Sequence, residues 1–341
     1  MKLFYILNIL LLAIGLSSCN VCDGDCDGTG ERTVPEIIFL SKSFDGPKTT
    51  LYGIYADGSN LEMLFDSVAC VSNFSRSGNI LVLKELGSYR ILVSLDLKNL
   101  ERTTIPSLSI ELDDVKFLDL SYDGRFALLA SDSHAEIVNL SDLSVSSLKS
   151  ISLSKCEPTF SSAGSILAYA SDSEIFIYDC NTGKTQTHPL GDLLSQSAFA
   201  PGRIRFSPDG KSIFLAVMQS GISKIAKFSM SDFSIETSDL GELSAFNPAV
   251  SAGSNYLAFN DLEGNIRYVA QPVGTQSESG FIYNCLPDNF CSDYAFNAAG
   301  KFAYIVRAGG ESGGNLYSAD LHTFISQYLF SNVVSFRWYL R

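Results

Sequence analysis

The stretch Phe206-Ser207-Pro208-Asp209-Gly210 is followed, at residues 213–217, by the apolar run Ile-Phe-Leu-Ala-Val. Serine, proline, aspartate and glycine are the residue types that tight turns use, because they supply the required φ angles and local hydrogen bonds. A short run that is apolar at consecutive positions is typical of a strand buried on both faces. An aromatic residue, a turn and a buried strand therefore form one structural unit.

This unit recurs along the chain, with an apolar anchor, then usually serine, then a turn ending in glycine. The other copies are Phe74-Ser75-Arg76-Ser77-Gly78, Leu120-Ser121-Tyr122-Asp123-Gly124, Phe160-Ser161-Ser162-Ala163-Gly164, Val250-Ser251-Ala252-Gly253 and Phe296-Asn297-Ala298-Ala299-Gly300. The anchors, from Phe74 onward, are 46, 40, 46, 44 and 46 residues apart, and Phe336 follows after a further 40. Periods of this length are typical of the blades of a β-propeller.

Each anchor is followed by two predicted strands and then a more polar outer strand. The first strands are residues 80–83, 126–130, 166–170, 213–217, 256–259 and 302–306, and the second are residues 91–95, 135–140, 175–178, 225–228, 266–269 and 316–319. Turns rich in aspartate, asparagine and glycine separate them, as hairpins require. The pattern predicts an all-β chain whose repeating unit is a four-stranded antiparallel sheet.

The two ends of the repeat region complement each other. Residues 37–40, 51–55 and 61–65 supply three strands with no anchor before them, and residues 333–340 supply an isolated innermost strand. Joining these ends in one blade closes the ring and removes exposed sheet edges. We expect a single propeller over residues 36–341 with seven blades, six or eight being the alternatives.

The repeats resemble the WD-like repeats of the TolB-type propeller family. The family pattern is an aromatic residue followed by Ser-Pro-Asp-Gly, and Phe206 to Gly210 reproduces it in full. Leu120 to Gly124 keeps the aspartate and the glycine. The resemblance implies the propeller fold and does not specify an activity.

The N-terminus resembles that of bacterial lipoproteins. Lys2 precedes an apolar run at residues 3–16, broken only by Asn8, and Leu16-Ser17-Ser18-Cys19 matches the lipobox. The run has the length of a signal-peptide core and is short for a transmembrane helix. The resemblance implies a signal peptide at residues 1–18, acylation of Cys19, and a flexible tether at residues 19–35. Lipid chains on Cys19 would hold the protein on a membrane of the cell envelope, outer membrane included, facing the periplasm or the surface.

Two groups of residues in predicted loops are weak candidates, one for a calcium site and the other for a disulfide bond. Asp23, Asp25 and Asp27 alternate as in a calcium loop, but the twelfth position of that loop is Val34 in place of glutamate, so a solvated acidic spacer is favoured. Cys285 and Cys291 bracket a turn-like pentapeptide and form a candidate disulfide, since export would place them in an oxidising compartment.

The sequence contains no convincing catalytic set. Gly310-Glu311-Ser312-Gly313-Gly314 fits a nucleophile-elbow pattern but is predicted to link two strands, where that motif requires a helix. The three histidines, His134, His188 and His322, fall in three different blades. We therefore predict no catalytic residue, no metal site and no cofactor.

Composition narrows the choice of partner. The formal charge of −13, with 24 Lys+Arg against 37 Asp+Glu, disfavours nucleic acid. We expect a monomeric, non-enzymatic scaffold that binds envelope proteins, with residues 191–202 and 272–293 as the longest candidate recognition loops. Two alternatives remain open: a hydrolase or lyase that acts on sugars or lactones through carboxylates at the central channel, and a propeller that senses a small molecule.

Overall fold

The computed structural model describes residues 33–42, 48–106, 111–132, 134–148, 156–162, 164–171, 174–190, 202–219, 221–237, 240, 243–251, 256–270, 279–283, 289–297, 301–308, 312–320, 323 and 325–338. In this part of the chain the only helix is the short 3₁₀ turn η1 (Leu112–Asp114). No helix there has the length and apolar character that crossing a bilayer requires. The rest of the regular structure is β-strand, as the sequence predicts.

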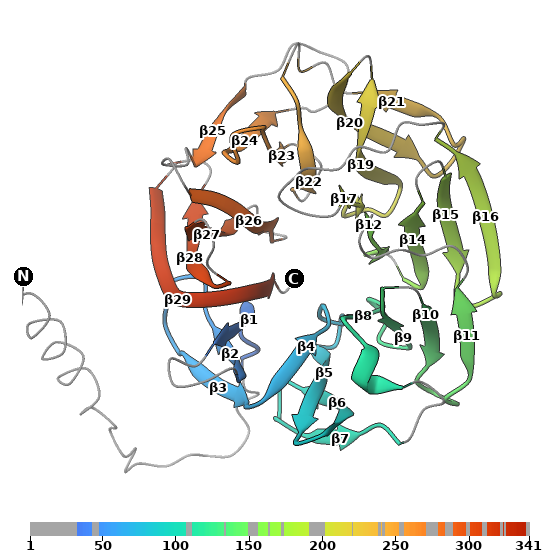
Figure 1. Cartoon of the computed structure of the whole chain (residues 1–341), viewed down its shortest axis with the longest axis vertical. Helices are drawn as coiled ribbons and strands as arrows, with labels where there is room; N and C mark the ends of the chain where they lie inside the picture. The colour runs from blue at the N-terminus through green and yellow to red at the C-terminus, as the bar shows by residue number, and fades with distance from the viewer. Residues whose placement is uncertain are drawn as a thin grey trace, which may run out of the picture. The chain divides into compact units, whose positions relative to one another are not determined.

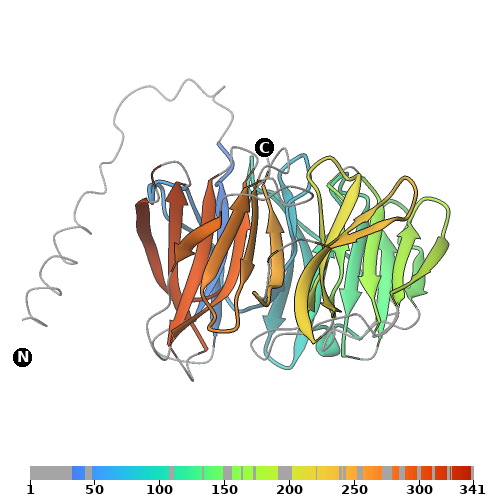
Figure 2. The same ribbon diagram turned by 90° about the horizontal axis from the view of Figure 1, so that it is seen from above.

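Five of the sheets contain four antiparallel strands each, built from consecutive segments, and we number them blades 1 to 5. They are β4–β7 (Val68–Val71, Asn79–Leu86, Tyr89–Asp96, Arg102–Thr104), β8–β11 (Phe117–Leu120, Phe126–Ala130, Ala135–Asn139, Val145–Leu148), β13–β16 (Thr159–Phe160, Ile166–Ala170, Glu174–Asp179, Lys184–Pro189), β18–β21 (Arg205–Phe206, Ser212–Gln219, Ile222–Ser229, Ile235–Thr237) and β22–β25 (Phe246–Val250, Tyr256–Asn260, Ile266–Ala270, Ser279–Tyr283). Figure 1 shows them arranged around a central axis, and Figure 2 shows their strands running between the two faces of a disc.

Blades 6 and 7 are joined by one long strand. Blade 6 contains β26 (Asn289–Phe296), β27 (Phe302–Ala308) and β28 (Gly314–Asp320), and blade 7 contains β1 (Ile37–Lys42), β2 (Thr49–Ile54) and β3 (Glu62–Phe65). The first half of β29 (Ile325–Trp338) is the outermost strand of blade 6. Its second half pairs antiparallel with β1, so that Phe336 faces Phe39 and Trp338 faces Ile37. The predicted closure, in which the C-terminal strand completes the N-terminal blade, is confirmed.

The core lies between neighbouring blades. Ile80 and Val82 of β5 pack into a cluster shared with blade 7, whereas the alternate residues Leu81 and Leu83 pack into a cluster shared with blade 2. Successive side chains of a strand point to opposite faces, so a strand buried between two blades is apolar at every position. This alternation explains the uninterrupted apolar runs in the sequence.

The serine after the anchor holds the tight turn of its blade. The Ser207 hydroxyl accepts a hydrogen bond from the backbone N–H of Ser212 at 2.9 Å and donates one to Asp209 at 2.6 Å. Asn297 takes this place in blade 6, where its side-chain oxygen accepts the N–H of Lys301 at 2.8 Å. Gly210 closes the turn with φ +70°, a conformation that side chains with a Cβ rarely adopt. The repeated motif is thus a hydrogen-bonded hairpin turn.

One sequence expectation is wrong in this region. Residues 272–293 are not a single recognition loop, because β25 occupies Ser279–Tyr283 and β26 begins at Asn289. Tyr283 and Cys291 pack into the core cluster between blades 5 and 6, so apolar burial turns both segments into strands. The other predicted loop, residues 191–202, lies mostly outside the described residues.

Candidate functional site

A cavity of about 650 Å³ lies where the innermost strands of all seven blades meet. The anchor of every blade contributes to its wall: Phe74, Leu120, Phe160, Phe206, Val250, Phe296 and Phe336. This volume lies within the range of small-molecule sites, which are typically apolar with a few placed polar groups. We call this cavity the central channel.

The residue immediately before each anchor also lines the central channel. These residues are Asn73, Asp119, Thr159, Arg205, Ala249, Ala295 and Ser335, one from each blade. Equivalent positions on the seven innermost strands therefore form a ring around the axis. The members of this ring differ in size, charge and polarity, so the wall is chemically asymmetric although the blades repeat.

An ion-pair cluster crosses one side of the central channel. Arg203 Nε lies 3.1 Å from Glu157 Oε2, and Arg203 Nη1 donates to Asp293 Oδ1 at 2.7 Å. A short parallel pairing of β12 (Cys156–Glu157) with β17 (Gly202–Arg203) sets Glu157 beside Arg203. Asp293 follows a register shift in β26, an irregularity that commonly redirects a side chain.

Burial and the neighbouring charges shift the pKa values of Arg203 and Asp293 in opposite directions. Burial lowers the pKa of the Arg203 guanidinium, but the neighbouring carboxylates of Glu157 and Asp293 outweigh it and raise that pKa. Burial raises the pKa of Asp293, whereas the charges of Arg203 and Arg337 outweigh this effect and lower it. Both shifts favour the charged forms of Arg203 and Asp293, as a buried ion pair requires.

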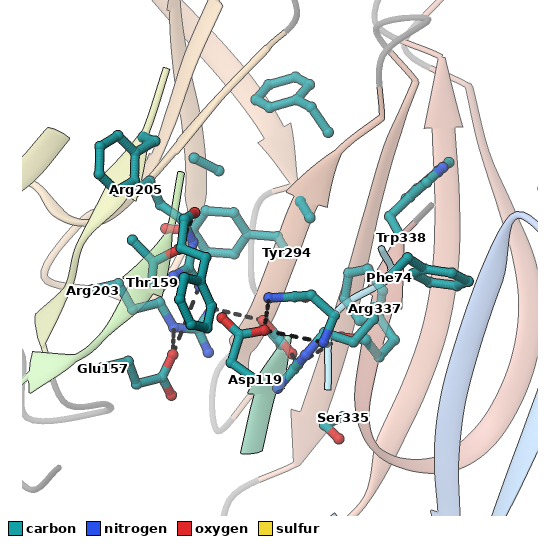
Figure 3. A pocket seen from close by; sticks show the side chains of 18 of the residues that line it. Phe74, Asp119, Glu157, Thr159, Arg203, Arg205, Tyr294, Ser335, Arg337 and Trp338 are labelled. Carbon is teal, nitrogen blue, oxygen red and sulfur yellow. Dashed lines mark hydrogen bonds and ion pairs between the residues drawn. The ribbon is translucent and has the colours of Figure 1, made fainter. Parts of the chain in front are cut away.

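Three further arginines line the central channel. Arg205 Nη2 lies 3.7 Å from Glu157 Oε2, and Arg337 Nη1 lies 3.9 Å from Asp293 Oδ2, both longer than hydrogen-bond distance. Arg307 donates to the backbone oxygen of Val334. Figure 3 shows Glu157 and Arg203 on one side of the cavity and Arg337 on the other.

Asp119 is the most deeply buried acid of the channel wall, with 1% of its surface exposed. Its Oδ1 accepts hydrogen bonds from the side chain of Asn73 at 2.9 Å and from the backbone N–H of Leu120 at 2.9 Å. Burial raises the pKa of this carboxyl, although these hydrogen bonds and Arg337 act in the opposite direction. The burial of Asp119 thus favours its protonated form.

Of the single residues proposed as site candidates from the sequence, those that the structure describes do not line the central channel. Cys19, the calcium candidates Asp23, Asp25 and Asp27, and Cys285 lie outside the described residues, so acylation, calcium binding and the Cys285–Cys291 pairing stay predictions. Cys291 itself is buried in β26. Cys70 and Cys180 are free thiols, and burial raises the pKa of each to about 12.

His134, His188 and the elbow serine Ser312 are also absent from the channel lining. His134 contacts Glu136 at 2.7 Å, His188 stacks on Phe233 with ring centroids 4.1 Å apart, and His322 lies outside the described residues. Ser312 accepts a hydrogen bond from Lys42 Nζ at 2.8 Å at the surface. Among the described residues, no group of three or more His, Cys, Asp or Glu side chains is arranged to hold a metal ion.

The channel arginines and acids are the residues that sequence reasoning missed. A signal was present, because Asp119 and Arg205 are charged residues directly before the anchors of otherwise apolar innermost strands. Comparing the same position across the six repeats would have placed both of them on one ring. Arg203, Arg307 and Arg337 carry no comparable signal.

Comparison with known proteins supports the fold. No protein-family model matches the sequence, and no curated protein matches it. Among solved structures, TolB from Acinetobacter baumannii is 15% identical with a TM-score of 0.54, and the alignment covers 89% of this chain and 66% of that one. A protein from Lactobacillus plantarum is 13% identical with a TM-score of 0.59, and the alignment covers 90% of this chain and 100% of that one. A putative 6-phosphogluconolactonase from Bacteroides uniformis is 15% identical with a TM-score of 0.58, and the alignment covers 89% of this chain and 98% of that one. The chain is a β-propeller similar in structure to TolB and lactonase-like propellers.

Proposed function

We propose that this protein is a non-enzymatic binding propeller of the cell envelope whose binding site is the central channel. The observation that carries the proposal is the channel itself, a cavity of about 650 Å³ lined by residues of every blade. Its wall combines an apolar surface with a few charged groups, the composition of a ligand site. The ligand is a small molecule or an inserted segment of an envelope protein.

Binding is favoured over catalysis by the chemistry of the channel wall. The described lining residues include no histidine, cysteine or lysine that would serve as base or nucleophile. Arg203 contacts both Glu157 and Asp293, and its charge holds the pKa of Asp293 below the ordinary value. Asp293 is therefore not suited to be the proton donor that glycoside hydrolysis requires.

Asp119 is the observation that favours the second candidate, a hydrolase or lyase for sugars or lactones. A buried carboxyl with a raised pKa is the usual form of a general acid. One of the similar structures is a putative 6-phosphogluconolactonase. Turnover of lactones or aryl glycosides by the purified protein, abolished in Asp119→Asn, would replace the binding proposal with this one.

The envelope location rests on the lipobox Leu16-Ser17-Ser18-Cys19. Cys19→Ala removes the thiol that would carry the lipid, so we expect the variant to leave the membrane fraction and appear in the soluble one. The measurement is immunoblotting of fractionated cells that express the full chain. Unchanged membrane association would contradict the anchor and would leave the channel proposal standing.

The channel proposal is tested by site-specific photo-crosslinking in intact cells. A photoreactive amino acid at Ser335, in the channel ring, should yield a discrete adduct with the bound partner or ligand, detected by mass shift. The matched control is the same amino acid at Thr187, which is exposed on the outermost strand β16 of blade 3. Adducts at Thr187 but not at Ser335, or at neither position, would refute the channel as the binding site.

A further inference from the structure

The central channel has a charge opposite in sign to that of the whole chain. The chain carries a formal charge of −13, yet the charged residues of the channel wall are four arginines, Arg203, Arg205, Arg307 and Arg337, and three acids, Asp119, Glu157 and Asp293. The wall therefore has a net charge of +1 when every one of these groups is ionised. Protonation of the buried Asp119 would bring it to +2.

Two of the acids are shared among three of the arginines. Glu157 lies within 4 Å of both Arg203 and Arg205, and Asp293 lies within 4 Å of both Arg203 and Arg337. Arg203 takes the short contact in each case. Arg205 Nη1 donates to the backbone oxygen of Ile204, and Arg337 Nη1 donates to that of Phe336. Their carboxylate contacts, at 3.7 and 3.9 Å, are longer than hydrogen bonds, so the remaining N–H groups can donate to a further anionic partner.

Burial acts on the charge of two of the four arginines, Arg205 and Arg307. Burial, and then the charge of Arg203, lower the pKa of the Arg205 guanidinium. Burial likewise lowers the pKa of Arg307, whose Nε is buried without a hydrogen-bond partner among the described residues. Both arginines are partly buried, the Arg205 side chain being 30% exposed, so a bound anion would offset part of the cost of their incomplete pairing. Trp338, whose indole N–H is also buried and unpaired there, adds a neutral donor to the same wall.

The rest of the channel wall is suited to the apolar or aromatic part of an organic ligand. Aromatic side chains line the cavity beside the arginines, among them Phe117, Phe160, Phe206, Phe290, Phe296 and Phe336. Such a surface favours an apolar or ring-shaped group, and guanidinium groups bind carboxylate or phosphate oxygens in a bidentate manner. Resting on the proposed function, we infer that the ligand of the central channel is an organic oxyanion, a carboxylate or phosphate group attached to an apolar or aromatic body.

The inference is tested with matched aromatic probes on the folded protein. Benzoate and phenyl phosphate share a ring and differ in the oxyanion, and benzamide has the same ring without a charge. Titration calorimetry at low ionic strength should give saturable binding of at least one of the two anions, at least tenfold tighter than that of benzamide. The stronger of the two anions separates a carboxylate ligand from a phosphate ligand.

Substitution identifies the arginines responsible. Arg205→Met and Arg307→Met retain much of the length of the side chain and remove its charge, so each should weaken binding of the preferred anion about tenfold or more. The matched control Arg125→Met removes a surface arginine that pairs with Asp123, and should leave binding unchanged. Circular dichroism verifies that each variant is folded, and Arg205→Lys, which keeps the charge, should recover part of the affinity.

Each result separates this inference from the proposed function. If benzamide binds as well as the anions, or if both methionine variants bind them like the wild type, the oxyanion inference is wrong while the channel remains a binding site. Absence of anion binding to the wild type, together with a crosslinked adduct at Ser335, likewise overturns the oxyanion inference alone. Absence of both anion binding and the adduct overturns the proposed function itself.

Discussion

The residue after each anchor is nearly the same in all of blades 1 to 6, whereas the residue before the anchor differs from blade to blade. After the anchor, blades 1 to 5 all have serine and blade 6 has asparagine; before it, blades 1 to 6 have Asn, Asp, Thr, Arg, Ala and Ala. These positions are only two residues apart at the end of the same innermost strand. Their difference must therefore come from what each side chain contacts.

The position after the anchor faces the turn of its own blade. Ser121 and Ser207 both accept the N–H of a residue five positions on, and both donate to the aspartate of the turn. Ser75, Ser251 and Asn297 accept the equivalent backbone N–H in blades 1, 5 and 6, so the same structural need recurs and the residue is repeated. The position before the anchor faces the shared channel, where each blade can supply a different group. In this propeller, the positions whose residue repeats stabilise the individual blades. The positions whose residue varies line the channel that all the blades share.

Blade 7 is the exception that supports this distinction. In β29 the residue after Phe336 is Arg337, where the other blades have a turn residue, and its guanidinium lies 3.9 Å from Asp293 across the channel wall. In blade 7 the position after the anchor therefore contributes to the channel wall. Ser335 before the anchor lines the channel like its counterparts.

Deletion of residues 333–341 removes both positions of blade 7 and should have the largest effect. β1 loses its antiparallel partner, and the cluster between blades 6 and 7 loses Val333, Phe336 and Trp338, each at most 6% exposed. Fully burying such a side chain contributes roughly 1.5–3 kcal/mol, so we expect loss of cooperative unfolding. Urea denaturation followed by circular dichroism measures this. Deletion of residues 339–341 alone is the control, and a native transition in the longer deletion would contradict ring closure.

Ser207→Ala should have an intermediate effect that is confined to stability. The buried N–H of Ser212 loses its acceptor, which costs about 1–3 kcal/mol of unfolding free energy. Ser335→Ala, at the channel position of blade 7, should change the unfolding free energy by less than about 0.5 kcal/mol. Urea unfolding curves compare the two. Equal losses would show that the two positions flanking the anchor do not have separate roles.

The fold was predictable because its determinants repeat. Six turns of similar sequence and paired apolar runs specified the blades, and the isolated runs at residues 37–40 and 333–340 specified the closure. The candidate site was not predictable in the same way. Arg203, Arg307 and Arg337 line one channel because the ring brings together strands of different blades, and a parallel strand pair sets Arg203 beside Glu157. Only Asp119 and Arg205 occupy repeat positions from which the channel could have been anticipated.

Two aspartates of blade 2, on either side of the anchor Leu120, should respond to pH with opposite signs. Burial raises the pKa of Asp119, so the folded protein binds this proton more tightly than the unfolded chain, whose carboxyl has a pKa near 3.9. The stabilising effect of the protonated carboxyl is complete below that value and is lost as the pH rises through the folded pKa. Asp119→Asn should therefore be more stable than the wild type above about pH 4, by about 1.4 kcal/mol for each unit of the shift.

Asp123, in the turn after Leu120, supplies the matched control. Burial raises its pKa, but hydrogen bonds from Ser121 and Arg125 outweigh burial and lower it below the ordinary value. Its charged form therefore stabilises the fold above the unfolded pKa, and this contribution is lost as the pH falls through the folded pKa. Asp123→Asn should be less stable than the wild type at pH 7, and the difference should shrink toward pH 3. Unfolding free energies measured from pH 3 to 8 test both variants. Shifts of the same sign would mean that the channel and the turn are not electrostatically distinct, and the comparison between the two flanking positions would then rest on hydrogen bonding alone.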